Sequence, residues 1–275
     1  MRRIVVIGVL VGCGEPGATP AIDATAVGAV DGAPATVDAS PPPSDAFLGG
    51  GDLVYTMTFQ DDVLAPQVLV DEVADDSVNL VPAPWDAARQ ALRVRVRNGD
   101  DWNGSGYPRS EVHAVAADVA NLAWDTRYRI TGALWFAPDA VFPTDGDYGV
   151  GQLVAGFQLH GDDGVPPVLA FHLQDGELRV DYRPTDGAVV QDDVAYGPMP
   201  HAQRLPYEVV YQGATDATGY LRVTIGDHVV LERSGPSNRA GNETAGYAKF
   251  GLYDYWHTVD DVLDIYLDDV RFYRY

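Results

Sequence analysis

The sequence predicts an all-β protein, built as a sandwich of two antiparallel sheets or a jelly roll. Short runs of alternating or β-branched residues recur from Asp52 onward, separated by clusters of Gly, Asp, Pro and Asn. No long stretch shows the apolar spacing of a helix. The expected strands are 53–59, 91–97, 110–115, 127–136, 151–160, 168–173, 177–182, 207–211, 220–225, 228–232, 247–255 and 262–273.

Turn residues connect several of these strands. Asp175-Gly176 and Gly226-Asp227 are typical of tight hairpins. The final strand, 262–273, alternates well and is expected to return to the sheet that contains 53–59. Within it, Asp268 and Asp269 offer carboxylate oxygens for a structural calcium, and a solvated acidic pair is the alternative.

Composition limits the classes of partner. The 275-residue chain has a formal net charge of −22, which argues against nucleic acid or an anionic membrane as a general partner. Any site for a polyanion must therefore be a local cationic region in a repulsive field. A single lysine, Lys249, stands among 18 basic residues.

The N-terminus predicts a targeting segment. Arg2 and Arg3 precede an apolar run, 4–12, that is too short to span a bilayer. The following Leu-Val-Gly-Cys, ending at Cys13, resembles the lipobox of bacterial lipoproteins. We expect residues 1–13 to be a lipoprotein signal peptide and lipobox, with lipidation at Cys13 and anchoring in the bacterial cell envelope. An unlipidated, secreted form is the alternative.

Two further boundaries follow from composition. Residues 14–51 are rich in Ala, Pro and Gly and nearly free of aromatic residues, so a disordered linker is expected. Residues 52–275 are expected to form the folded β-domain. Cys13 is the single cysteine, which excludes an intramolecular disulfide.

Three expected strands carry polar, titratable side chains at a spacing of two residues, opposite an apolar face. Each pattern alone has a simpler explanation, such as a surface ion pair or a histidine at a strand end. Their conjunction predicts one shared site. The residues are Arg109, Glu111 and His113 on the first strand, Gln158 and His160 on the second, and Lys249 and Tyr253 on the third.

The motifs on these strands resemble those of a known group. Arg-Ser-Glu-Val at 109–112, Gln-Leu-His-Gly at 158–161 and Tyr-Ala-Lys-Phe-Gly-Leu-Tyr at 247–253 resemble the signature of jelly-roll polysaccharide lyases. That group includes alginate lyases, glucuronan lyases and the heparin lyase I type. Ala248 and His113 depart from its usual residues, an aromatic and an arginine. The resemblance covers 52–275 and implies a concanavalin-like sandwich with a concave substrate cleft.

The resemblance implies β-elimination at a 4-O-linked uronate, which leaves a 4,5-unsaturated end. Arg109, Gln158 and His160 would neutralise the uronate carboxylate, so that negative charge can build up as the C5–H bond breaks. Tyr253 is the candidate proton-transfer group, and Lys249 and Arg109 are expected to lower its pKa. One tyrosine suffices for glucuronate or mannuronate, the substrates that we favour, whereas guluronate requires His160 as base and Tyr253 as acid.

Further residues are candidates for holding substrate. Glu111 lies within the first motif and His113 directly follows it. Tyr247 and Tyr255 share the face of Lys249, where sugar stacking and packing both remain open. Arg95 belongs to a stripe of arginines on 91–97 that holds flanking carboxylates if that strand lines the same groove.

Two other classes of function stay open. A non-catalytic module that binds acidic glycan would use the same arginine and glutamine. A glycoside hydrolase would need two carboxylic acids, and Glu111 is the one acid within the motifs. We expect a monomeric lyase that needs no cofactor and binds acidic polysaccharide but no nucleic acid, with the membrane reached only through the lipid anchor.

Overall fold

The computed structural model describes residues 50–60, 68–71, 74, 76–101, 104, 106–114, 122–141, 152–160, 167–184, 192–237, 245–255, 259 and 261–275. The expected signal peptide, Cys13 and nearly all of the linker lie outside these residues. Within them the chain forms strands and turns, and no α-helix is present. Accordingly, no helix of this described part is long and apolar enough to cross a membrane.

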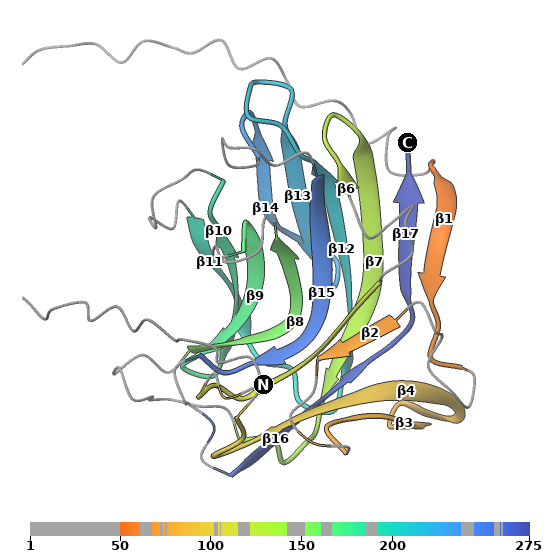
Figure 1. Cartoon of the computed structure of the whole chain (residues 1–275), viewed down its shortest axis with the longest axis vertical. Coiled ribbons are helices and arrows are strands. Elements are labelled where there is room, and N and C mark those ends of the chain that lie inside the picture. The colour runs from red at the N-terminus through yellow and green to blue at the C-terminus, as the bar shows by residue number, and fades with distance from the viewer. Residues whose placement is uncertain are drawn as a thin grey trace, which may run out of the picture. The chain divides into compact units, whose positions relative to one another are not determined.

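The described strands form two antiparallel sheets (Figure 1). The nine-stranded sheet consists of β1 (Asp52–Met57), β3 (Val78–Ala83), β4 (Asp86–Arg97), β7 (Arg127–Phe136), β12 (Arg204–Gln212), β13 (Tyr220–Ile225), β14 (His228–Ser234), β16 (Val262–Leu267) and β17 (Val270–Arg274). The eight-stranded sheet consists of β2 (Val68–Asp71), β5 (Arg109–Ala114), β6 (Leu122–Ala123), β8 (Gln152–His160), β9 (Leu169–Gln174), β10 (Glu177–Tyr182), β11 (Asp192–Pro198) and β15 (Ala245–Tyr253).

Aromatic side chains join the inner faces of the two sheets. Phe157 of β8 lies with its ring centroid 5.9 Å from that of Tyr207 on β12, and Phe250 of β15 lies 6.1 Å from Phe272 on β17. All four are buried, as the alternation of apolar residues along their strands predicts. The predicted two-sheet sandwich is therefore confirmed.

Both predicted hairpins are present. Asp175 and Gly176 have φ angles of 52° and 77° and connect β9 to β10, which suits the positive φ that two-residue hairpin turns require. Gly226 and Asp227 connect β13 to β14. Four strands, β2, β3, β6 and β11, were not predicted. Pro82 weakens the strand pattern of β3, and β3 is indeed an edge strand, where proline is tolerated.

The predicted strand 262–273 is two strands, β16 and β17, separated by Asp268 and Asp269. Leu267 and Val270 are both buried although their spacing is odd, so the side-chain alternation shifts across the break. The expectation that this segment returns to the first strand is correct for β17, because Met57 of β1 pairs with Val270.

The calcium expectation does not fit the surroundings of Asp268 and Asp269, because protein donors already engage their carboxylates. Arg89 donates to Asp268 Oδ1 at 2.8 Å, and Arg204 donates to its Oδ2 at 2.7 Å. Asp269 Oδ1 accepts from the Phe59 backbone at 2.9 Å, while Arg271 lies 3.4 Å from its Oδ2. Guanidinium groups thus occupy the place where a cation would bind.

His172 of β9 is a buried histidine beside the buried carboxylate of Asp181 on β10. Their closest atoms, Nε2 and Oδ2, are 3.4 Å apart, and Arg183 donates to the same Oδ2 at 3.0 Å. Burial lowers the pKa of His172 from 6.5 to about 4, although Asp181 acts in the opposite direction. The imidazole is therefore neutral in the folded protein at neutral pH.

This burial predicts a loss of stability in mild acid. The unfolded chain binds a proton at His172 below a pKa of 6.5, whereas the folded chain does so only near 4, so stability falls as the pH drops through this window. Between about pH 7 and about pH 4.5, the loss due to His172 should be on the order of 2 kcal/mol. Urea unfolding of the wild type and of His172→Gln at both pH values measures it.

The matched control is His228→Gln, because the His228 side chain is 70% exposed. Its pH dependence should equal that of the wild type. Equal acid sensitivity in His172→Gln and the wild type would contradict the assignment.

Candidate active site

The candidate site lies on three neighbouring strands, with β15 between β5 and β8. Lys249 of β15 pairs with His113 on one side and with Gln158 on the other. Tyr253 pairs with Arg109, and residues paired in this way project to the same face of a sheet. The intervening residues, Val112, Leu159 and Phe250, are fully buried between the sheets. The structure thus brings the three sequence motifs together on the outer face of the eight-stranded sheet.

A glycine allows the close approach of β15 to β5. Gly251 has a φ of 148°, and a Cβ atom there would lie 2.7 Å from the Cα of Glu111. Because Gly251 pairs with Glu111, the sheet face beside this carboxylate carries no competing side chain. The glycine of the third motif therefore has a structural reason.

Glu111 is the centre of the polar contacts. Its side chain is 1% exposed, with Arg109 Nε at 3.2 Å and Lys249 Nζ at 3.8 Å from its Oε2. Gln158 Nε2 donates to its Oε1. Burial of a carboxylate is costly unless cations and hydrogen bonds compensate it, and these contacts provide both.

Gln158 continues the contacts toward His160. Its side-chain Oε1 lies 3.0 Å from His160 Nε2, and Gln158 itself is only 3% exposed. The imidazole of His160 stacks on the Tyr247 ring, with centroids 5.1 Å apart and planes 11° apart. His113 contacts the same tyrosine edge-on at 6.1 Å. One face of Tyr247 is therefore used for packing against His160.

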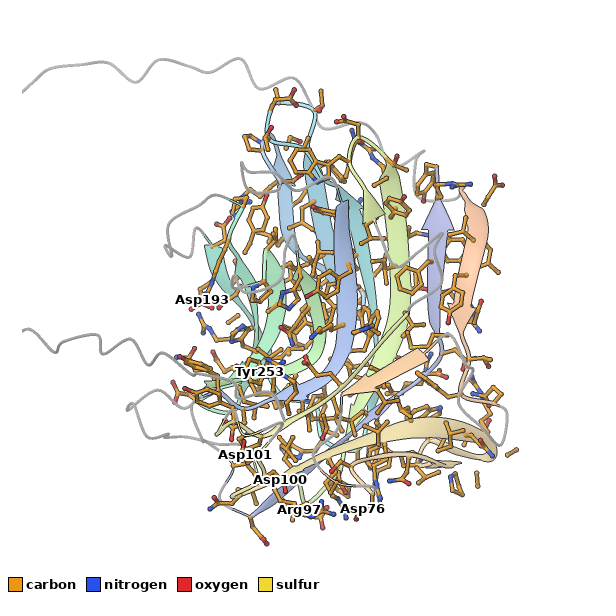
Figure 2. All side chains as sticks on the ribbon, viewed as in Figure 1. Asp76, Arg97, Asp100, Asp101, Asp193 and Tyr253 are labelled. Carbon is orange, nitrogen blue, oxygen red and sulfur yellow. The ribbon has the colours of Figure 1, made fainter. Side chains whose placement is uncertain are left out.

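Tyr253 lies at the C-terminal end of β15 (Figure 2). The guanidinium carbon of Arg109 is 4.0 Å from the centroid of its ring. Burial raises the pKa of Tyr253, and this outweighs Arg109, which acts to lower it. The expected lowering of this pKa is wrong because partial burial of the phenol is the larger effect. Tyr253 is therefore a protonated phenol at neutral pH.

A second aromatic group adjoins Tyr253. Tyr107 stacks on Tyr255 with centroids 4.5 Å apart, and Tyr253 lies 6.5 Å from Tyr107 and 6.0 Å from Tyr255. The Asp254 backbone donates to Pro108 O at 2.9 Å, which ties the loop before β5 to the end of β15. Tyr255 is 39% exposed. Tyr107 was not predicted individually, since its role depends on this long-range contact.

Arg95 does not join the site. Its strand, β4, belongs to the nine-stranded sheet, so the condition for the arginine stripe to line the groove is not met. The Arg95 guanidinium donates to both oxygens of Asp264 on β16 at 2.6 Å. Arg97 lies beside Asp76 near β4, and both are away from Tyr253 in Figure 2. Arg95 therefore pairs with a neighbouring strand instead of facing substrate.

Across the described residues, no cluster of three or more His, Cys, Asp or Glu side chains is arranged to hold a metal ion.

His172 and Asp181 share the outer face with Gln158, since Gln158 pairs with Ala170 of β9, and Ala170 pairs with Asp181. His172 belongs to none of the three motifs, and its burial beside Asp181 could not be predicted from residue spacing alone.

Comparisons with known proteins identify the fold. No protein-family profile and no curated protein sequence matches the chain. Among solved structures, an endo-β-1,4-glucuronan lyase from the fungus Trichoderma reesei superposes with a TM-score of 0.61 at 15% identity. The match covers 81% of this chain and 95% of the fungal enzyme.

Alginate lyases of polysaccharide lyase family 7 are also similar. Alginate lyase A1-II' gives a TM-score of 0.55 at 18% identity, covering 73% of this chain and 84% of that one. Alginate lyase AlgAT5 gives 0.52 at 17% identity, covering 74% and 84%. At these identities the comparisons establish the fold, and the chain therefore has the jelly-roll sandwich fold of polysaccharide lyases.

Proposed function

We propose that residues 52–275 are a polysaccharide lyase that cleaves a 4-O-linked uronate polymer of the glucuronan or alginate type by β-elimination. The observation that carries the proposal is the convergence of five expected residues on neighbouring strands: Arg109, Gln158, His160, Lys249 and Tyr253. The jelly-roll fold shared with glucuronan and alginate lyases supports it. The proposed partner is an acidic polysaccharide, bound by a monomer without a cofactor.

The charges of the site suit an anionic sugar. Arg109 and Lys249 are two cations beside the single carboxylate of Glu111, so the group keeps a net positive charge in an acidic protein. Arg109 contacts Glu111 through Nε and lies over the Tyr253 ring, and its planar guanidinium has the geometry that pairs with a carboxylate. Neutralising that carboxylate stabilises the negative charge that develops as C5–H breaks.

The protonation of Tyr253 supports a division of roles. A phenol with a raised pKa is suited to protonate the leaving O4 and unsuited to remove the C5 proton. His160 then acts as the base. This arrangement fits uronates whose C5 proton and O4 lie on opposite faces of the ring, such as guluronate, whereas glucuronate and mannuronate, which the sequence favours, need one group for both proton transfers.

A glycoside hydrolase is disfavoured by the same geometry. It requires two carboxylic acids at the scissile bond. Glu111 is the one acid on β5, β8 and β15, and it is buried and engaged by Arg109, Lys249 and Gln158. A binding module without turnover remains the alternative, and the assay below separates the two.

Tyr253→Phe should reduce kcat by about 10²- to 10⁴-fold, because the variant loses the proton donated to O4 and keeps the ring beside Arg109. The measurement is the ultraviolet absorbance of the 4,5-unsaturated uronate formed from polyguluronate, polymannuronate and glucuronan. Tyr275→Phe is the control, since Tyr275 is exposed and lies outside the site.

Other results of this assay would point elsewhere. New reducing ends without the unsaturated product would indicate hydrolysis, and binding of polymer without turnover would indicate a module. Full activity in Tyr253→Phe would contradict the role of the phenol.

Tyr255→Ala should raise KM by about 3- to 10-fold with little change in kcat, because the exposed ring beside Tyr253 is proposed to stack on a sugar next to the cleaved bond. Initial rates at varied polymer concentration measure this effect. Tyr275→Ala is the matched control, with a tyrosine that is 38% exposed and remote from the site. An unchanged KM would leave Tyr255 with a packing role only.

We also propose that Cys13 carries a lipid that anchors the protein in the bacterial cell envelope. The basic residues, the short apolar run and the lipobox-like sequence support this. In a bacterial host, Cys13→Ser should move the protein from the membrane fraction to the soluble fraction and abolish incorporation of labelled fatty acid. Equal fractionation of both proteins would contradict lipidation.

A further inference from the structure

We propose that the protein binds acidic polysaccharide at a second, non-catalytic site, in a hollow on the outer face of the nine-stranded sheet. The hollow has a volume of about 350 Å³, and its lining includes Thr131, Arg204, Pro206, Glu208, Thr224 and Arg271. The candidate active site lies on the other sheet, so the two sites face away from each other across the sandwich. The choice of a uronate polymer as ligand rests on the proposed lyase function.

Four neighbouring strands form the hollow, and they can be followed in Figure 1. Glu208 of β12 pairs with Thr131 of β7 and with Thr224 of β13, and Thr131 also pairs with Arg271 of β17. Paired residues project to the same face, so these four side chains form one row. The residues that follow or precede them on β7, β12 and β13 are fully buried between the sheets: Ile130, Val209 and Val223. The row therefore lies on the outer face, and at a strand spacing of about 4.8 Å it spans about 14 Å.

Small side chains explain why this part of the sheet face is hollow. Thr131 and Thr224 stand on either side of Glu208 in the row, and Pro206 of β12 pairs with Ala133 of β7. None of these small residues extends far from the sheet, whereas long arginine side chains stand at the edge of the hollow. Threonine hydroxyls can donate and accept hydrogen bonds, as the hydroxyls of a sugar do. The floor therefore suits a sugar ring.

Two arginines of the lining keep N–H donors for a ligand. Arg204 directs Nε and Nη2 to one oxygen of Asp268, at 2.9 and 2.7 Å. Arg271 Nη2 lies 3.4 Å from Asp269 Oδ2, which is longer than a strong charge-assisted bond. Among the residues that the structure describes, neither arginine has another polar partner. Their side chains are 39% and 43% exposed, and a guanidinium has five donors in a planar fork that matches a carboxylate.

The acids near the hollow already have partners within the protein. Glu208 lies 3.7 Å from Arg129, while Asp269 accepts from the Phe59 backbone and lies 3.6 Å from Arg89. Four guanidinium groups thus surround three carboxylates: Arg89, Arg129, Arg204 and Arg271 against Glu208, Asp268 and Asp269. In a chain with a net charge of −22, this local excess of positive charge favours an anionic ligand here.

An acidic polysaccharide uses all of these features together. Its carboxylates match the arginines at the edge, its hydroxyls match the threonines of the floor, and its length matches a row that is longer than a single sugar ring. A polymer held in the hollow stays close to the protein while the candidate active site releases its product, because the second contact raises the local concentration of polymer. A short oligosaccharide cannot reach both faces of the sandwich and gains nothing from the second site.

Arg271→Gln tests the site through binding, which does not depend on turnover. Isothermal titration calorimetry with tetrasaccharides of mannuronate, guluronate and glucuronate is performed in a Tyr253→Phe background, so that the ligand stays intact. Arg271→Gln should weaken binding at one of the sites by about 10-fold or more, because the variant loses a charge-assisted contact to a carboxylate. Arg274→Gln is the matched control, since it makes the same charge change on the same strand, where Arg274 pairs with Asp52 outside the hollow.

Thr224→Tyr is a second variant that keeps every charge and fills the hollow with a larger side chain. Its side chain lies on the outer face and is partly exposed, so the larger residue does not enter the core. It should weaken the same binding event as Arg271→Gln does. Tetrasaccharide binding that neither variant alters would overturn the second site, and so would inorganic sulfate that competes for the hollow as strongly as the tetrasaccharide does.

Kinetics with ligands of two lengths separate this proposal from the proposed function. In an active lyase, Arg271→Gln should raise KM for long polymer by about 3- to 10-fold and leave kcat and the KM for a tetrasaccharide unchanged. Lyase activity with an unchanged KM for polymer would refute the second site and keep the enzyme assignment. Binding that Arg271→Gln weakens in a protein that forms no unsaturated product would keep the second site and refute the lyase.

Discussion

The register of β15 between β5 and β8 is the constraint on which the site depends. Side chains alternate along a strand, so a slip of one residue would turn the site side chains into the core and the core residues outward. Phe250 and Leu252 prevent this, because each fills the space between the sheets and is fully buried. The apolar residues of β15 therefore position its polar residues, Lys249 and Tyr253. Gly251 allows β5 to approach closely, with Glu111 between the two cations Arg109 and Lys249.

The sequence predicted the elements that are determined by residues close together in the chain. Alternation identified β5, β8 and β15, and turn residues identified the hairpins at Asp175 and Gly226. Shared faces then grouped Arg109, Gln158 and Lys249 correctly, because antiparallel pairing preserves the alternation across strands.

Features that depend on distant parts of the chain were not predictable in the same way. The surroundings of Arg95 depend on which of the two sheets contains β4. The alternating residue pattern of an amphipathic strand is the same in either sheet, so the sequence does not distinguish them. The pKa of Tyr253 depends on burial, which spacing does not reveal, and this reversed the expected direction. The partners of Asp268 at the break, Arg89 and Arg204, likewise come from other strands.

The pairing of β1 with β17 has a consequence for how the domain assembles. Asp52 lies opposite Arg274, so the first and last strands of the sandwich hold each other in place. Most contacts in such a topology join residues far apart in the chain. The entropy cost of closing the long loops therefore comes before the stabilising contacts form. The nine-stranded sheet is therefore completed only when both ends of the domain are present, and folding is expected to be a slow, late event relative to synthesis. During that interval the strands of the core remain exposed, which makes a highly charged chain an advantage because like charges keep unfolded copies apart.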